Sequence, residues 1–294
     1  MKKKYIFLNI LSIFALQNII SSMEKNIIVK DINPEYSAEH ADKTLQLVKL
    51  LNKLDKRHPV FLDSFQPYQV DEKDSQLMIN LINDGADVNA TDRYGTTPLM
   101  WAAILNDKNM AELFISKGAD IRATNISNVN ALTYAAHFLS VGVAKLLIDK
   151  GININATDKH GYTALISASN RDNNYRMMKL LIDKGANVNI QDDKGNTALI
   201  IAARADYTGD VVDLLIRSGA QVNLKNKEDL SALISALYNR NTKEYYTGII
   251  KSLIKAGANI NDRNPYNGSI ASEAIRRHYG KQVAHELLDR IVEQ

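Results

Sequence analysis

Apolar side chains recur along this chain with the spacing of amphipathic helices, and the pattern restarts at short intervals. The first stripe recurs at every third residue, at Leu45, Val48, Leu51 and Leu54. It predicts a helix over residues 41–56, and a second apolar side predicts another helix over residues 71–83. The stretch between them, residues 58–70, contains two prolines and is expected to be irregular.

Glycines end the apolar segments of the remaining chain at nearly constant intervals. Six of them stand 33, 33, 34, 34 and 38 residues apart, at Gly85, Gly118, Gly151, Gly185, Gly219 and Gly257. Each opens a similar phrase, of which Gly85-Ala86-Asp87-Val88-Asn89 is the first. We predict a helix end at each glycine, because a left-handed residue there costs other residues about 1–2 kcal/mol. The Asp and Asn side chains are interpreted as turn-forming groups rather than calcium ligands, since Val or Ile alternates with them.

A second set of markers has the same period and predicts helix starts. Its members are the N-cap formers Thr97, Asn130, Thr163, Thr197, Ser231 and Ser269. Small residues follow, such as Ala102 and Ala103, and they would let the next helix approach closely. Each unit therefore reads as a turn, a short helix, a tight connection, a second helix and a glycine stop.

These units resemble the ankyrin repeat, most closely over residues 92–103 (DRYGTTPLMWAA) and again over 158–168 and 192–203. The resemblance implies an all-α ankyrin-repeat solenoid over residues 71–294, in which helix-turn-helix units stack and carry β-turn fingers. Five full units are expected at 91–123, 124–156, 157–190, 191–224 and 225–262, after a degenerate unit ending at Ala90 and before a C-terminal capping unit at 263–294. Asn128 and Asp229 replace the turn glycine in two units, and both tolerate the left-handed conformation.

The first 22 residues have the pattern of a secretory signal peptide. Lys2, Lys3 and Lys4 precede an apolar run that is shorter than a membrane-spanning helix, and Ser21 and Ser22 follow it. Export across the cytoplasmic membrane, to the periplasm or beyond, is therefore expected, with no stable membrane insertion afterwards. The alternative is an uncleaved signal-anchor that tethers the protein to the membrane. Residues 23–70 are expected to form an N-terminal segment with a capping helix.

The amino-acid composition and the absence of certain motifs exclude several kinds of functional site. The chain has no cysteine, which excludes disulfides, thiolate zinc sites and cysteine nucleophiles. Its net charge is +3, and without the three N-terminal lysines the charges balance at zero, so nucleic acid is not the expected partner. The six histidines form no HxH or HxxxH pair, and no nucleophile elbow or phosphate loop is present. We therefore expect no enzyme activity, no cofactor and no metal.

In the ankyrin family, partners bind at the turn tips and at exposed residues of the first helix. Matched one by one, the candidate partner-binding residues are Arg93, Tyr94, Ile104, Leu105, Ile126, Val129, His137, Phe138, Lys159, His160, Tyr162, Arg171, Lys194 and Arg204. Four of them would form an apolar cluster in solvent: Ile104, Leu105, Val129 and Phe138. The alternative is that these four tuck into the stack or lie under residues 23–70.

The longer intervals predict extra residues inside the helix pairs. The expected connections are residues 170–175, 205–209 and 239–247. Tyr207, Tyr245 and Tyr246 fall there and are predicted to form a second contact edge, unless each packs at the start of its second helix. The function expected is a monomeric, exported interaction module that binds a protein partner through the concave face of the solenoid. The alternative is a structural or inhibitory subunit of an envelope enzyme.

Overall fold

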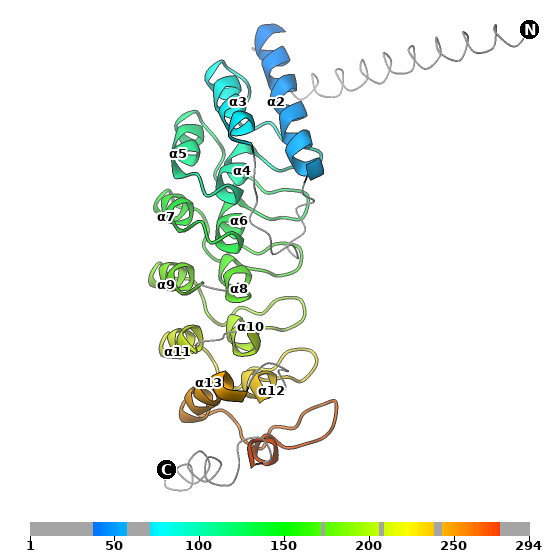
Figure 1. The fold of residues 1–294 in the computed structure, drawn as a ribbon, viewed down its shortest axis with the longest axis vertical. Helices are drawn as coiled ribbons and strands as arrows, with labels where there is room; N and C mark the ends of the chain where they lie inside the picture. Colours follow the sequence, from blue (N-terminus) through cyan, green and yellow to red (C-terminus); the bar gives the residue numbers. More distant parts are fainter. Residues whose placement is uncertain (1–37, 58–70, 172–173, 206–208, 238–242, 277–294) are drawn as a thin grey trace, which may run out of the picture.

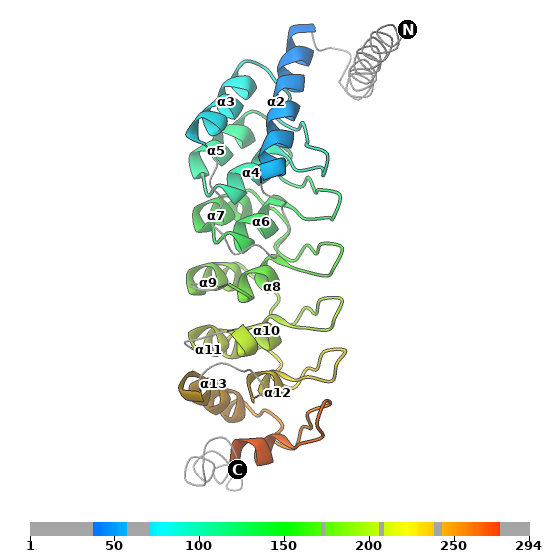
Figure 2. The same ribbon diagram turned by 45° about the vertical axis from the view of Figure 1, so that its right-hand side comes forward.

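A computed structural model describes residues 38–57, 71–171, 174–205, 209–237 and 243–276, and it shows an elongated stack of helix pairs (Figures 1 and 2). The inner helices are those beside the projecting fingers: α4 (Pro98–Ile104), α6 (Ala131–His137), α8 (Ala164–Ser169), α10 (Ala198–Ala205) and α12 (Ala232–Leu237). The outer helices are α5 (Lys108–Ser116), α7 (Val141–Asp149), α9 (Tyr175–Asp183), α11 (Asp210–Arg217) and α13 (Lys243–Lys255). Each inner helix packs on the next inner helix and on its own outer helix. A final helical segment covers residues 271–276.

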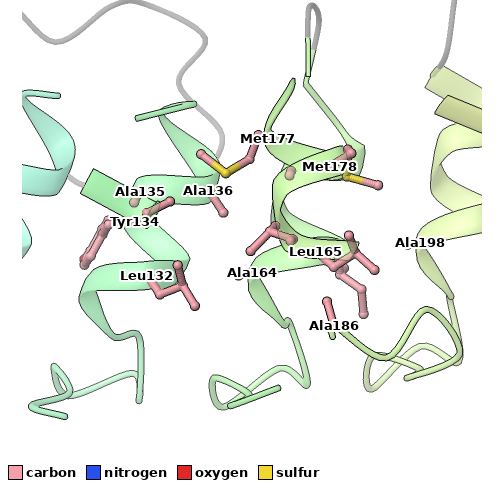
Figure 3. Close-up of a cluster of buried hydrophobic side chains, with 14 of the residues drawn as sticks. Leu132, Tyr134, Ala135, Ala136, Ala164, Leu165, Met177, Met178, Ala186 and Ala198 are labelled. Atoms are coloured by element: carbon pink, nitrogen blue, oxygen red, sulfur yellow. The ribbon is translucent and has the colours of Figure 1, made fainter. Parts of the chain in front are cut away.

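The core is one continuous layer between consecutive units. The leucine two residues after each start marker is buried, at Leu99, Leu132, Leu165, Leu199 and Leu233. Alanines of the inner helices are equally inaccessible, among them Ala102, Ala103, Ala135, Ala136 and Ala168. Figure 3 shows how Leu165 and Ala164 of α8 lie beside Met177 and Met178 of α9. Small side chains let neighbouring helices approach, and the leucines fill the space between units.

Five of the six predicted helix starts are confirmed as N-caps. The Thr97 hydroxyl accepts a hydrogen bond from the Met100 amide at 3.3 Å, and the Asn130 side chain accepts one from the Thr133 amide at 2.9 Å. The equivalent bonds in the next three units come from the amides of Ile166, Ile200 and Ile234. Each bond satisfies an amide that the first helical turn leaves free.

The sixth start marker, Ser269, was placed one residue too early. Ile270 makes an isolated β-bridge with Arg263, as Asn130 does with Thr124 in the second finger. The last finger is therefore one residue longer, and its helix begins at residue 271. The prediction that every extra residue lies inside a helix pair is wrong at this point. The connection predicted over 239–247 also ends early, because α13 already begins at Lys243.

The six predicted helix ends are confirmed by their backbone. All six stop glycines have positive φ angles between 86° and 100°. Asn128 and Asp229, which replace the turn glycine, both have φ of 60° and adopt the left-handed conformation expected of them.

The N-terminal helix α2 (Ala38–Arg57) packs on α3 (Glu72–Asn83) and caps the stack. Both helices match the stripes predicted over 41–56 and 71–83. The Asn52 side chain accepts a hydrogen bond from the Arg93 amide at 3.1 Å, and the Thr44 hydroxyl accepts one from the Asp87 amide at 2.9 Å. These two side chains take the place of a preceding repeat, because each bonds an amide that would otherwise face the missing unit.

Several expectations fall outside the described residues. The signal peptide of residues 1–22, the irregular stretch at 58–70, Tyr207 and the side chains of Tyr245 and Tyr246 all lie there. Among the residues that are described, no helix has the length and apolar character needed to cross a membrane.

Candidate functional site

Each finger is shaped by one Asp or Asn side chain at its base. The Asp92 Oδ1 atom accepts hydrogen bonds from the Tyr94 and Thr96 amides, both at 2.8 Å. The same pair of bonds recurs in the next four fingers, around Asn125, Asp158, Asp192 and Asn226. The three carboxylates among these side chains, those of Asp92, Asp158 and Asp192, are buried. They serve as turn clamps, so the acidic residues of the fingers do not form a chemical centre.

Backbone hydrogen bonds then lock the first five finger tips in register. The Ile126 amide donates to the Tyr94 carbonyl at 2.9 Å, and the Lys159 amide donates to the Ser127 carbonyl at 3.0 Å. Two further bonds continue the row, from Asp193 to His160 at 2.9 Å and from Lys227 to Lys194 at 2.8 Å. We call the paired tip residues the finger ridge: Arg93, Tyr94, Ile126, Ser127, Lys159, His160, Asp193, Lys194, Lys227 and Glu228.

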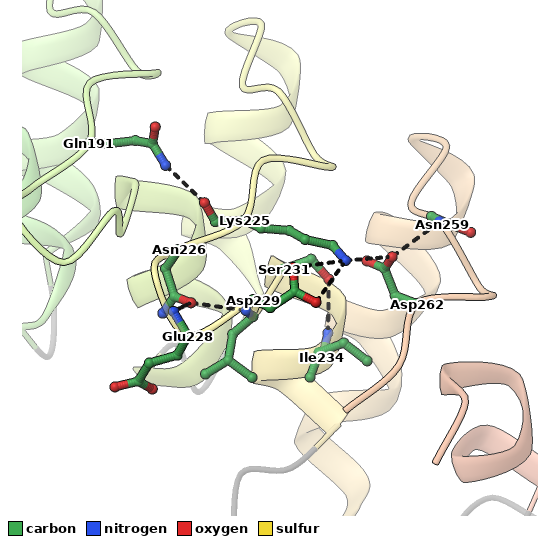
Figure 4. A network of polar contacts seen from close by, with 10 residues as sticks. Gln191, Lys225, Asn226, Glu228, Asp229, Ser231, Ile234, Asn259 and Asp262 are labelled. Atoms are coloured by element: carbon green, nitrogen blue, oxygen red, sulfur yellow. Dashed lines mark hydrogen bonds and ion pairs between the residues drawn. The ribbon is translucent and has the colours of Figure 1, made fainter. Parts of the chain in front are cut away.

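The row of backbone bonds does not continue into the sixth finger. Pro265 occupies the place of the donor residue there, and proline has no N–H. Side chains hold this junction instead: the Tyr266 hydroxyl donates to Glu228 at 2.6 Å. The Lys225 ammonium lies 3.2 Å from the buried Asp262 carboxylate and 3.3 Å from Asp229 (Figure 4). Burial acts to lower the pKa of Lys225, but its bonds to Asp262 and Asp229 outweigh that effect and raise the pKa.

Most ridge residues predicted as binding positions are exposed. Tyr94 and Ile126 keep 41% and 56% of their accessible surface, which is unusual for large apolar side chains. Arg93, Lys159, His160 and Lys194 are exposed as well. The Arg93 guanidinium lies 4.8 Å from the centre of the Tyr94 ring, a cation–π arrangement. Backbone atoms and the base clamps fix the ridge, so these tip side chains are not required for its shape.

The predicted apolar cluster in solvent is wrong. Ile104 and Val129 each keep 4% of their surface, and Leu105 and Phe138 are half-buried. Ile104 ends α4 and faces the stack, while Val129 lies at the finger base, directly before the Asn130 cap. Their side chains therefore fill the space between units, which is the alternative that the sequence left open.

His137 was also predicted on the binding surface, and this prediction is wrong. It ends α6 and is buried, with its ring edge-on to Phe138 at 4.9 Å between centroids. Burial lowers the pKa of His137 to about 4, and the positive charge of Arg171 adds to the effect. The imidazole is therefore neutral at pH 7 and is part of the core. Of the remaining predicted residues, Tyr162 and Arg171 are half-buried and Arg204 is exposed on α10.

A second set of hydrogen bonds, made by Asn side chains of the Gly-Ala-Asp-Val-Asn-like phrases, joins four pairs of consecutive units. The Asn89 side chain accepts a hydrogen bond from the Asp120 amide of the next unit at 2.7 Å. Equivalent bonds join Asn155 to Asn187, Asn189 to Gln221 and Asn223 to Asn259, each at 2.8 Å. The interpretation of these phrases as turn-forming is confirmed, because the Asp87, Asn187 and Asn259 side chains each accept a hydrogen bond from the amide two residues on. Their bonds between units are a finding of the structure. Across the described part of the chain, no group of three or more His, Asp or Glu side chains could hold a metal ion.

Sequence reasoning missed three tip residues of the fifth and sixth fingers: Lys227, Glu228 and Tyr266. All three are exposed, and Tyr266 keeps 72% of its surface. The repeat register already places them at the same tip positions as Arg93 and Tyr94, so carrying the register through to the last finger would have found them.

A glycine pair tests the finger geometry. A Cβ atom on Gly161 would lie 2.9 Å from the Asp193 amide nitrogen, the atom that bonds the His160 carbonyl, whereas a Cβ on Gly151 would have no neighbour within 4 Å. Both glycines have positive φ. Gly151→Ala should therefore cost about 1–2 kcal/mol, the strain of a left-handed alanine, and Gly161→Ala about 1–2 kcal/mol more. Urea unfolding of both variants gives the difference, and equal losses would contradict the close approach of the fingers.

The repeated helix pairs and fingers agree with the result of comparing the sequence with known protein families. The family model described as ankyrin repeats (3 copies) matches residues 68–158, 122–192 and 165–264, which together span more than half of the chain. The chain belongs to the ankyrin-repeat family. Such repeats generally mediate protein–protein interaction, and proteins built from them are typically non-enzymatic. Among curated proteins, none matches this sequence.

Proposed function

We propose that this protein is an exported interaction module that binds a protein partner through the finger ridge. One observation carries the proposal. The ridge is held by backbone hydrogen bonds and buried clamps, while large side chains at its tips, Tyr94 and Ile126, remain in solvent. A preorganised row of exposed aromatic, aliphatic and basic groups favours association, because little ordering is needed on binding.

The binding surface is tested by two matched double variants. Ile126→Ser with Lys159→Ala removes one exposed aliphatic and one exposed cationic side chain from the ridge. Leu77→Ser with Arg176→Ala removes the same two kinds of group from α3 and α9, away from the ridge. We expect the ridge variant to weaken partner binding about tenfold or more, and the control to bind as the wild type does.

The measurement is affinity capture from the native host with quantitative mass spectrometry, followed by titration of the partner recovered. Thermal unfolding of each variant checks that the fold is unchanged. A partner that stays bound to the ridge variant, or is lost equally from both variants, would overturn the proposed surface.

Export is tested separately. The basic start and short apolar run of residues 1–22 support cleavage near Ser22. We expect protein isolated from the host to begin at Met23 or a nearby residue, and to be found outside the cytoplasm. N-terminal peptide mapping decides this, and an intact Met1–Ile20 peptide in a soluble cytoplasmic fraction would overturn export.

A further inference from the structure

The charged side chains of the finger ridge are unevenly distributed along the stack. The first three tips carry Arg93, Lys159 and His160, and their acidic residues, Asp92 and Asp158, are buried as clamps. The fourth tip carries Asp193 next to Lys194, and the fifth carries Glu228 next to Lys227, while Asp229 of the fifth finger is ion-paired with Lys225. One end of the ridge is therefore basic and the other is not.

The ridge lysines differ from several cations of the outer helices in their surroundings. Four outer-helix cations are paired with carboxylates one turn away, in Lys108–Glu112, Lys145–Asp149, Lys179–Asp183 and Arg217–Asp213. Lys159 and Lys194 form no ion pair with any described residue. Their ammonium groups are exposed, and no carboxylate within the described part of the chain neutralises them.

Apolar surface lies among these cations. Ile126 stands on the tip between those of Tyr94 and Lys159, and the backbone bonds keep the three in order. Packed helices lie about 8–10 Å apart, so Arg93 and Lys159, two units apart, are separated by about 20 Å along the stack. An extended peptide covers that distance with about six residues.

We propose that the basic end of the finger ridge binds an acidic segment of the partner protein, with carboxylates facing Arg93, Lys159 and Lys194 and an apolar side chain against Ile126. This inference rests on the proposed function and adds the chemistry of the partner. A peptide fits better than a nucleic acid, because Asp193 and Glu228 would repel a continuous polyanion further along the same ridge.

The test uses the full chain and three pools of 15-residue peptides. All pools are randomised over Leu, Tyr, Ser and Gly, and four fixed positions are Glu in one pool, Gln in the second and Lys in the third. Binding is measured by fluorescence anisotropy at 50 and 300 mM salt, with a single-stranded DNA 15-mer as a separate polyanion. The variants are Lys159→Glu with Lys194→Glu on the ridge, and Lys150→Glu with Arg176→Glu at the end of α7 and on α9, away from the ridge. The two double variants change the net charge equally.

We expect the wild type to bind the Glu pool about tenfold or more tightly than the Gln pool at 50 mM salt, with the preference shrinking at 300 mM. The ridge variant should lose the preference and the outer variant should keep it. Equal binding of the Glu and Gln pools, tightest binding of the Lys pool, or DNA binding as tight as that of the Glu pool would overturn the inference. These outcomes test the chemistry of the partner and not the proposed function. The proposed function is tested by whether the Ile126→Ser, Lys159→Ala variant loses its natural partner.

Discussion

Replacing Leu165 by alanine is expected to lower the free energy of unfolding by about 2–5 kcal/mol. The side chain is 1% exposed in α8, which packs on α6, α9 and α10 (Figure 3). Truncation would leave a cavity in the middle of the stack. Since repeat stability depends on contacts with neighbouring units, the loss should extend to the units on both sides.

The matched control is Leu77→Ala on α3, where the leucine keeps 44% of its surface. We expect its cost to stay below about 1 kcal/mol, because exposed positions contribute little. Urea unfolding measures both values, and hydrogen exchange shows which units loosen. A loss below about half a kcal/mol for Leu165→Ala would contradict the register of the repeats.

Acid should destabilise the protein through His137. The buried imidazole has a pKa of about 4 in the fold, against its ordinary value of 6.5. The folded state therefore binds this proton less well than the unfolded state does. The stability that neutral His137 contributes is complete above pH 6.5 and is lost as the pH falls towards 4. From these two values, the loss between pH 7 and pH 5 is about 2 kcal/mol.

His137→Leu should remove that dependence, because the variant has no group to protonate at this place. His160→Gln is the matched control: its histidine is exposed at a finger tip, so we expect the pH dependence of the wild type. Urea unfolding at pH 7, 6 and 5 measures the slopes. An unchanged slope in His137→Leu would show that the buried imidazole is not the group responsible.

The repeat architecture could be predicted from the sequence because its markers are local. An N-cap such as Thr97 accepts a hydrogen bond from the backbone amide three residues later, so its role depends on its own helix turn alone. A stop glycine such as Gly151 ends its helix by adopting a positive φ angle, which is a property of that residue alone. Neither depends on what packs against the helix. The exposed tips Tyr94 and Ile126 were found for the same reason, since the register of a finger places them at its end.

Which candidate residues of the inner helices and finger bases reach solvent could not be predicted in this way. Ile104, Val129 and His137 occupy places that are exposed in a single repeat, and their burial depends on how closely the next unit approaches. That approach results from alanines and leucines of two units packing together, which no pattern within one unit reveals. The extra residue of the last finger could not be predicted either. Ser269 is as good an N-cap former as the earlier markers, so the sequence places the helix start there.

The sequence by itself therefore determined the family, the starts and ends of most described helices and the tips of the fingers, because each follows from residues within one or two turns. Only the tertiary structure decided which apolar and basic groups reach solvent. It buried Ile104, Val129 and His137 in the core. Among the described residues, it left Lys159 and Lys194 without a carboxylate partner, whereas Lys108, Lys145 and Lys179 of the outer helices are paired. Burial and pairing are properties of neighbouring units in contact, and they exist only once the stack has formed.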